Sequence, residues 1–199
     1  MAGLETHYSA RDIESRILAA LRAAGLNPEQ RLSPEDLAAL DHFHTGGLRA
    51  SRELMELARI RAEDRVLDIG AGLAGPARLI AYARGCRVDC LDMSADFCAG
   101  AVLLNRLTGL DDRVVVHEGS ALKMPFGRVL KPGGRFSFQE IVAGEVAPSH
   151  FPLPWATDPT DSFLVTADEM RSLLGRTGFT AETFEDVSEA HLSASIANA

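Results

Sequence analysis

A glycine-rich turn is the part of the sequence whose residue types and spacing best fit a chemical role. Gly70, Gly72 and Gly75 follow the pattern G-x-G-x-x-G, directly after a short apolar run and before a helix-like segment. Glycines at these positions let the backbone turn tightly and approach a ligand closely, and the start of the helix offers free N–H donors. Because this context is the one that the pattern requires, the turn indicates a nucleotide-type binding loop.

Two aspartates accompany this turn. Asp92 lies about 24 positions beyond Asp68, at the end of the next apolar run, where a carboxylate accepts both ribose hydroxyls of an adenosine. Asp68 stands two residues before the first glycine, a position at which dinucleotide-binding loops normally carry an apolar residue. Its carboxylate would repel a pyrophosphate and attract an ammonium or sulfonium group. The two acids therefore favour a cationic adenosyl cofactor over a dinucleotide.

Alternating segments place the turn in a parallel sheet. Short apolar runs at 66–69, 87–91 and 113–116 are typical of strands, and helices are expected at 76–84 and 95–107. Strand and helix alternate at the spacing of βαβ units, which predicts parallel pairing and right-handed crossovers. The sequence thus predicts an α/β fold with a Rossmann-like, mostly parallel sheet and helices on both faces.

Helical segments precede the predicted sheet, and further elements follow it. We expect an N-terminal helical cap over 1–60 and one cofactor-binding structural unit over 61–199. Thr166 and Glu169 form the pattern of a capping box at the start of a helix that runs to Gly175. The remaining predicted elements are a helix between Ser9 and Gly25, helices at 36–40 and 48–60, and strands at 134–141 and 179–187.

Composition limits the classes of partner. The chain has 199 residues, 46% of them hydrophobic, which suffices for one compact domain. Its net charge of −8 disfavours a nucleic-acid partner. No stretch approaches the ~20 apolar residues of a membrane span, and the first residues lack a signal-peptide pattern, so we expect a cytoplasmic protein without a membrane partner. Cys86, Cys90 and Cys98 fit burial beside a strand, and no metal site is predicted.

Four motifs taken together resemble the class I S-adenosylmethionine-dependent methyltransferases. They are VLDIGAGLAGPAR at 66–78, VDCLDMS at 88–94, EGSALKMPF at 118–126 and RVLKPGG at 128–134. The FHTGG segment at 43–47 is similar to the loop before the first motif in small-molecule members, including those that act on phosphoethanolamine, sarcosine or dimethylglycine. The resemblance implies methyl transfer from S-adenosylmethionine to a nitrogen or oxygen atom of a small molecule.

The resemblance also implies roles for particular residues. Asp92 would hold the ribose, and Met93 would pack on the adenine, although Met93 fits ordinary core packing equally well. Methyl transfer needs alignment and exclusion of water more than it needs a base. For a hydroxyl acceptor, His44 and His150 are the candidate bases. The other positions implied at the cofactor are Asp68, Gly70, Ala71, Gly72, Ser120 and Ala121, with Thr45, Gly46 and Tyr8 at the methionine end.

The sequence departs from the family pattern at four places. The usual third glycine falls at Ala74, although Gly75 follows. Ser120 stands where an aspartate commonly accepts from the adenine amino group, so a charge-assisted hydrogen bond is lost. Between Ser120 and Gly133 there are 12 residues, fewer than the ~15–20 of a strand with its crossover, so we expect the fourth strand to be absent. A seventh strand is also missing from the pattern. Two alternatives therefore stay open: a remnant cofactor-binding module without catalysis, and a dinucleotide oxidoreductase.

Overall fold

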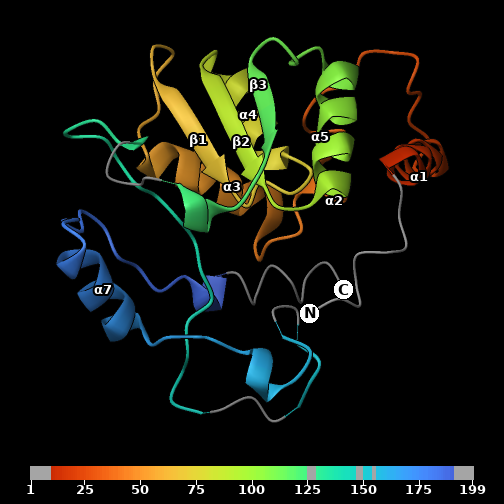
Figure 1. Ribbon diagram of the computed structural model, residues 1–199. Helices are drawn as coiled ribbons and strands as arrows, with labels where there is room; N and C mark the ends of the chain where they lie inside the picture. Colours follow the sequence, from red (N-terminus) through yellow and green to blue (C-terminus); the bar gives the residue numbers. More distant parts are fainter. Residues whose placement is uncertain (1–9, 125–128, 147–149, 154–155, 191–199) are drawn as a thin grey trace. The chain divides into compact units, whose positions relative to one another are not determined.

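The computed structural model describes residues 10–124, 129–146, 150–153 and 156–190 (Figure 1). These residues fall into two units, one ending at Ser137 and the other beginning at Phe138. The first unit contains the sheet and the glycine-rich turn. Within the described residues, no helix is both long enough and apolar enough to cross a membrane.

Three strands of the described chain form a parallel sheet in the first unit. They are β1 (Arg65–Ile69), β2 (Arg87–Asp92) and β3 (Val114–Glu118), in the order β1-β2-β3. Asp68 of β1 is in register with Cys90 of β2. The structure confirms the parallel α/β class, and each strand begins and ends within two residues of its predicted range.

The two helices that connect the strands, α4 (Gly75–Arg84) and α5 (Ala95–Thr108), pack against the same face of the sheet (Figure 1). Val88 and Cys90 of β2, 1% and 0% exposed, share one buried cluster with alanines of both helices. On the other face, Val115 is 45% exposed. The sequence predicted helices on both faces. For α4 and α5 the structure differs from this prediction. The crossovers from β1 to β2 and from β2 to β3 run in the same direction along the sheet, and right-handed crossovers in one direction place their helices on one face.

Among the residues described, three helices precede the sheet: α1 (Ala10–Ala23), α2 (Ala38–Asp41) and α3 (Gly47–Leu57). The helix α1 lies along α5, where Ile17 and Leu104 belong to a second buried cluster. The three helices predicted before the sheet are confirmed. The helix α2 begins two residues later than expected, and α3 ends three residues earlier. Ser9, the proposed cap of α1, lies outside the described residues.

Two predicted strands are wrong. The segments 134–141 and 179–187 have irregular backbone, and neither joins the sheet that the described residues form. Alternating apolar residues give a segment the propensity for a strand, but a strand also needs a partner with free backbone groups. In the second unit, α7 (Ala167–Arg176) confirms the capping box, because Thr166 and Glu169 each accept from the other's backbone N–H.

Candidate cofactor-binding site

The carboxyl ends of the three strands meet at one edge of the sheet. The backbone N–H groups of Gly70 and Ala71 donate to the carbonyl oxygen of Leu91 over 2.8 and 3.2 Å. The N–H of Gly119, which follows β3, donates to the carbonyl oxygen of Asp92 over 2.8 Å. These bonds tie the residues after β1 and after β3 to the end of β2. This edge is where open parallel α/β sheets bind ligands.

The glycine-rich turn has its backbone exposed to open space. Gly70 and Gly72 have φ angles of 71° and 53°, in the left-handed region that residues with a Cβ adopt at a cost. A Cβ built on either residue would meet no heavy atom of the described residues within 4 Å. Their conformation therefore requires glycine, and the part of the chain that the structure describes leaves the space above them open to a ligand. The side chain of Ala71 packs in the core cluster, so this residue offers its backbone to that space.

The carboxylate of Asp92 closes the turn. Its Oδ2 accepts from the N–H of Gly72 over 2.8 Å, and its Oδ1 accepts from the N–H of Ser94 over 2.9 Å. Each carboxylate oxygen carries a second lone pair. Asp92 is thus held in place by the backbone and can still accept from hydroxyl groups of a ligand.

Asp68 carries an unsatisfied charge beneath the turn. The residue is partly accessible, yet its Oδ2 is buried and has no hydrogen-bond partner among the residues that the structure describes. Burial, and to a smaller extent the charge of Asp92, raises the pKa of Asp68 to about 6. A buried carboxylate oxygen without a partner is costly. A positively charged ligand group nearby would reduce this cost.

The residues after β2 and β3 form the rim of the same edge. Met93 is 73% exposed, which excludes the alternative that it is an ordinary core residue. The hydroxyl of Ser120 accepts from the N–H of Leu122 over 3.3 Å and so caps the 3-10 helix η1 (Ala121–Lys123). Ser120 therefore already serves the backbone, and Ala121 begins the short helix beside it.

The loop between α2 and α3, residues 42–46, contains the predicted methionine-end residues. Gly46 has a φ of 84° and precedes α3, and Thr45 is exposed beside it. The Nε2 of His44 lies 3.0 Å from the hydroxyl of Ser51, so its ring is engaged within this part of the chain. His150 belongs to the second unit, and Tyr8 lies outside the described residues.

A buried polar network below the turn was not predicted from the sequence. Arg78 of α4 is 0% exposed and forms hydrogen bonds with Asp41 of α2 and Asn105 of α5. The signal that could have indicated it is helical spacing. Arg78 stands three and four residues from Ala81 and Ala74, both of which are buried, so it falls on the apolar face of its helix.

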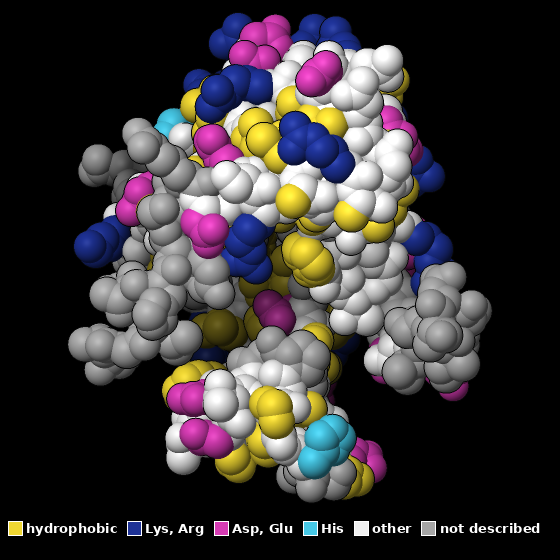
Figure 2. Space-filling view, turned by 90° about the vertical axis from the view of Figure 1, so that its right-hand side faces the viewer, with side chains coloured by type: hydrophobic (Ala, Val, Ile, Leu, Met, Phe, Trp, Pro, Cys, Tyr) yellow, Lys and Arg dark blue, Asp and Glu magenta, His cyan; other side chains and the backbone are white. Residues whose placement is uncertain are grey.

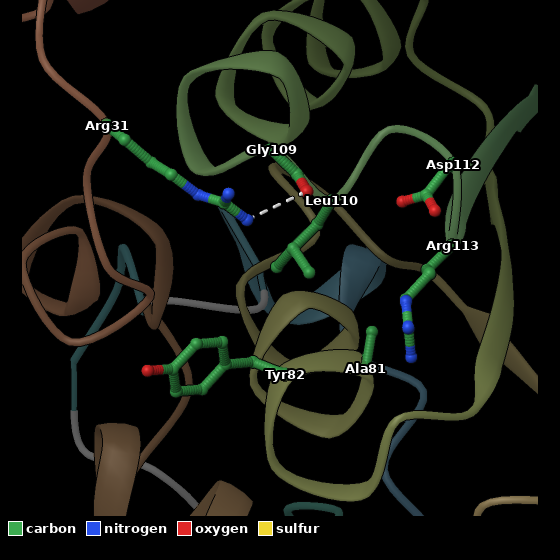
Figure 3. Close-up of a pocket in the computed structure, with 7 residues that line it drawn as sticks. All are labelled: Arg31, Ala81, Tyr82, Gly109, Leu110, Asp112 and Arg113. Atoms are coloured by element: carbon green, nitrogen blue, oxygen red, sulfur yellow. Dashed lines mark hydrogen bonds between the residues drawn. The ribbon is translucent and has the colours of Figure 1, made fainter.

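A pocket of about 370 Å³ lies away from this edge, near the start of β3 (Figure 3). Arg31 donates to the carbonyl oxygens of Thr108 and Gly109 over 3.1 and 3.2 Å, and Arg113 donates to that of Gly85 over 2.6 Å. Both guanidinium groups thus satisfy carbonyl groups at helix C-termini. The polar lining of this pocket is explained by helix capping.

The known proteins to which the chain is similar in sequence are methyltransferases. No family model matches the chain. The sterol 24-C-methyltransferase of Eremothecium gossypii is 29% identical over 179 residues, which cover 73% of this chain and 48% of that protein. The glycine/sarcosine/dimethylglycine N-methyltransferase of Actinopolyspora halophila is 27% identical over 172 residues, which cover 73% of this chain and 30% of that protein.

A shorter match reaches higher identity. The sarcosine/dimethylglycine N-methyltransferase of Aphanothece halophytica is 40% identical over 65 residues, 33% of this chain and 24% of that protein. Among solved structures, a SAM-dependent methyltransferase from Thiobacillus denitrificans in complex with S-adenosyl-L-homocysteine is 24% identical, covers 43% of this chain and 34% of that chain, and has a TM-score of 0.38.

The relatives confirm the resemblance to small-molecule methyltransferases. The chain spans about half or less of the length of the curated relatives named above. The similarity therefore covers only part of each relative, and the activity of this chain is a proposal.

Proposed function

We propose that this protein binds S-adenosylmethionine at the glycine-rich turn and takes part in methyl transfer to a nitrogen or oxygen atom of a small molecule. The observation that carries the proposal is the pair of carboxylates at the turn. Asp68 has a buried oxygen that no described residue partners, which suits a cationic group. Asp92 is fixed by backbone N–H groups and keeps lone pairs for ribose hydroxyls. The named relatives support the methyl-transfer part.

Each residue of the site would bind a different part of the cofactor. S-adenosylmethionine supplies an electrophilic methyl group on a sulfonium sulfur. The backbone of Gly70 and Gly72 leaves room for close approach, Asp92 holds hydroxyl groups, and Asp68 provides the negative charge. Because methyl transfer is an in-line displacement, the main task of the chain is to align the partners and exclude water.

Proton handling depends on the acceptor. An amine that arrives unprotonated needs no base, whereas a hydroxyl group would need one. His44 is our candidate in the first unit, because it lies in the loop that precedes α3 and its ring nitrogen already exchanges a hydrogen bond with Ser51. His150 stays a prediction for the second unit.

The distribution of charged side chains on the surface bears on which class of molecule accepts the methyl group. In Figure 2, the described side chains of both charges on the upper part of the face are interspersed with hydrophobic ones, and they form no continuous basic patch there. With the net charge of −8, this supports a small molecule rather than a nucleic acid. A cytoplasmic location is part of the same proposal.

Calorimetric titration tests the cofactor part. We expect S-adenosylhomocysteine to bind to the full chain and NAD to bind more weakly, because Asp68 repels a pyrophosphate. Tighter binding of NAD would support the oxidoreductase, and no binding of either ligand at millimolar concentration would refute both. Asp111→Asn is a matched control, because Asp111 is exposed and precedes β3 at the other end of the sheet.

A panel of amine, phenol and thiol acceptors tests the catalytic part. Methyl transfer to any of them, detected as S-adenosylhomocysteine formed, would establish the enzyme. Cofactor binding without transfer to any member of the panel would favour the remnant module instead.

A further inference from the structure

The guanidinium group of Arg78 joins three parts of the first unit. Its Nη2 donates to Oδ2 of Asp41 over 2.6 Å and to the carbonyl oxygen of Leu73 over 2.5 Å. Its Nη1 donates to Oδ1 of Asn105 over 2.8 Å. These acceptors belong to α2, to the glycine-rich turn and to α5. One buried side chain thus connects the cap, the turn and the helix that follows β2.

The ion pair is costly to bury. The side chains of Arg78 and Asp41 are 0% and 1% exposed. Burial lowers the pKa of Arg78, and the carboxylate of Asp41 opposes that shift. Buried ion pairs can often be replaced by apolar residues without loss of stability. Stability alone therefore does not explain why this position carries an arginine.

The cap end of the network lies directly on the start of α4. A Cβ on Gly75 would stand 2.5 Å from the carbonyl oxygen of Asp41, so glycine allows this contact. Oδ1 of Asp41 lies 2.6 Å from Nδ1 of His42, the first residue of the loop at 42–46. The carboxylate of Asp41 thus connects Arg78 to the loop that carries Thr45 and Gly46.

The other end of the network holds the turn. Leu73, whose carbonyl group accepts from Arg78, lies between Gly72 and Ala74. The N–H of Gly72 is bound by Asp92, and Ala74 has a φ of 60°, which is unfavourable for a residue with a Cβ. Arg78 from one side and Asp92 from the other therefore fix a stretch of backbone that would not keep this shape unaided.

We propose that Asp41 and Arg78 are positioning residues, which hold the glycine-rich turn in its ligand-receiving shape and couple that shape to the seating of the loop at 42–46. The inference rests on the proposed function, because it assigns this network to the same cofactor. It adds that affinity for the cofactor depends on residues that do not touch it.

A pair of substitutions separates positioning from stability. Asp41→Leu leaves the charge of Arg78 buried without its partner and is expected to destabilise the fold strongly. The double variant Asp41→Leu/Arg78→Met is expected to regain much of that stability. It does not regain the hydrogen bond to Leu73, so its affinity for S-adenosylhomocysteine is expected to stay about tenfold or more below that of the unsubstituted protein. Affinity that returns together with stability would overturn the proposal.

A milder variant avoids loss of the fold. Arg78→Lys keeps the charge beside Asp41, but an ammonium group does not reproduce the fork that serves three acceptors. Calorimetry is expected to show weakened binding of S-adenosylhomocysteine with a small change in melting temperature. The control is Arg84→Met on the same helix, which removes the ion pair with Glu56 and is expected to leave affinity unchanged. Equal affinities of the two variants would contradict the proposal.

Hydrogen exchange gives a readout that needs no cofactor. In the unliganded protein, Arg78→Lys is expected to speed amide exchange in peptides that cover 70–75, and Arg84→Met is not. Unchanged exchange there in Arg78→Lys would refute the positioning role. If the unsubstituted protein binds no S-adenosylhomocysteine, the proposed function fails, and this comparison still decides whether the network holds the turn.

Discussion

The backbone N–H of Gly72 donates to Oδ2 of Asp92 over 2.8 Å, and this bond joins the turn that follows β1 to the last residue of β2. The carboxylate proposed to hold ribose hydroxyls is therefore the same group that shapes the turn. Both functions need the carboxylate to be ionised and fixed, and a second backbone bond, from Ser94, fixes it further. The site is thus organised before any ligand arrives.

Substitution of Asp92 should consequently affect both binding and stability. Asp92→Asn keeps one acceptor oxygen and loses the charge, so we expect about tenfold weaker binding of S-adenosylhomocysteine and a loss of roughly 1 kcal/mol of unfolding free energy. Calorimetry and urea denaturation measure the two effects. The control Asp111→Asn should change neither, and unaltered affinity in Asp92→Asn would remove the residue from the site.

The raised pKa of Asp68 makes the stability of the unliganded protein depend on pH. Its pKa is about 6 in the folded chain against 3.8 as the ordinary value, so the folded state binds more protons between these limits. Stability is therefore lost as pH rises from about 4 to about 6, and it then levels off. Asp68→Asn removes this loss, and we expect it to stabilise the protein at pH 7.5 by on the order of 1–3 kcal/mol.

Urea denaturation at pH 4 and pH 7.5 checks this expectation. The gain should be several-fold smaller at pH 4 than at pH 7.5, because pH 4 lies close to the ordinary pKa of 3.8 and most of the loss of stability occurs above it. A variant that is less stable than the parent at pH 7.5 would show that Asp68 is already compensated by the protein.

The affinities for S-adenosylmethionine and for NAD should change in opposite directions with pH, because the two ligands carry opposite charges near Asp68. A cationic ligand prefers ionised Asp68, so affinity for S-adenosylmethionine should rise about tenfold from pH 5 to pH 7 as the pKa near 6 is passed. NAD carries a pyrophosphate and should bind more weakly over the same range. In Asp68→Asn, calorimetry should show a flat profile for both ligands, and a rise that persists would assign the effect to another group.

The sequence predicted best those features that depend on local chemistry. The G-x-G-x-x-G spacing located the turn, and the pairing of Thr166 with Glu169 located the start of α7, because both patterns act within a few residues. The strand expected at 134–141 failed because pairing depends on a distant partner that local alternation does not specify. The helical spacing of Arg78 could have indicated its burial, but its partners in α2 and α5 are distant in the sequence and no local pattern specifies them.

Two glycines in the turn should respond differently to alanine, because different physical causes require them. At Gly75, a Cβ would stand 2.5 Å from the backbone carbonyl oxygen of Asp41, which has little freedom to move. Gly75→Ala should therefore cost about 1–3 kcal/mol of unfolding free energy through overpacking. At Gly70, a Cβ would meet no atom of the described residues within 4 Å, but it would need a φ of 71° and would occupy the open space above the turn.

Gly70→Ala should accordingly cost about 1 kcal/mol of stability from backbone strain, with a much larger effect on ligand binding. Thermal denaturation with and without S-adenosylhomocysteine separates the two cases. In Gly75→Ala the melting temperature should fall while a saturating ligand still raises it. In Gly70→Ala the ligand should produce little or no rise, because the new methyl group lies where the ligand must approach the backbone. If the ligand stabilised Gly70→Ala as well as the parent, the space above the turn would not be the binding site.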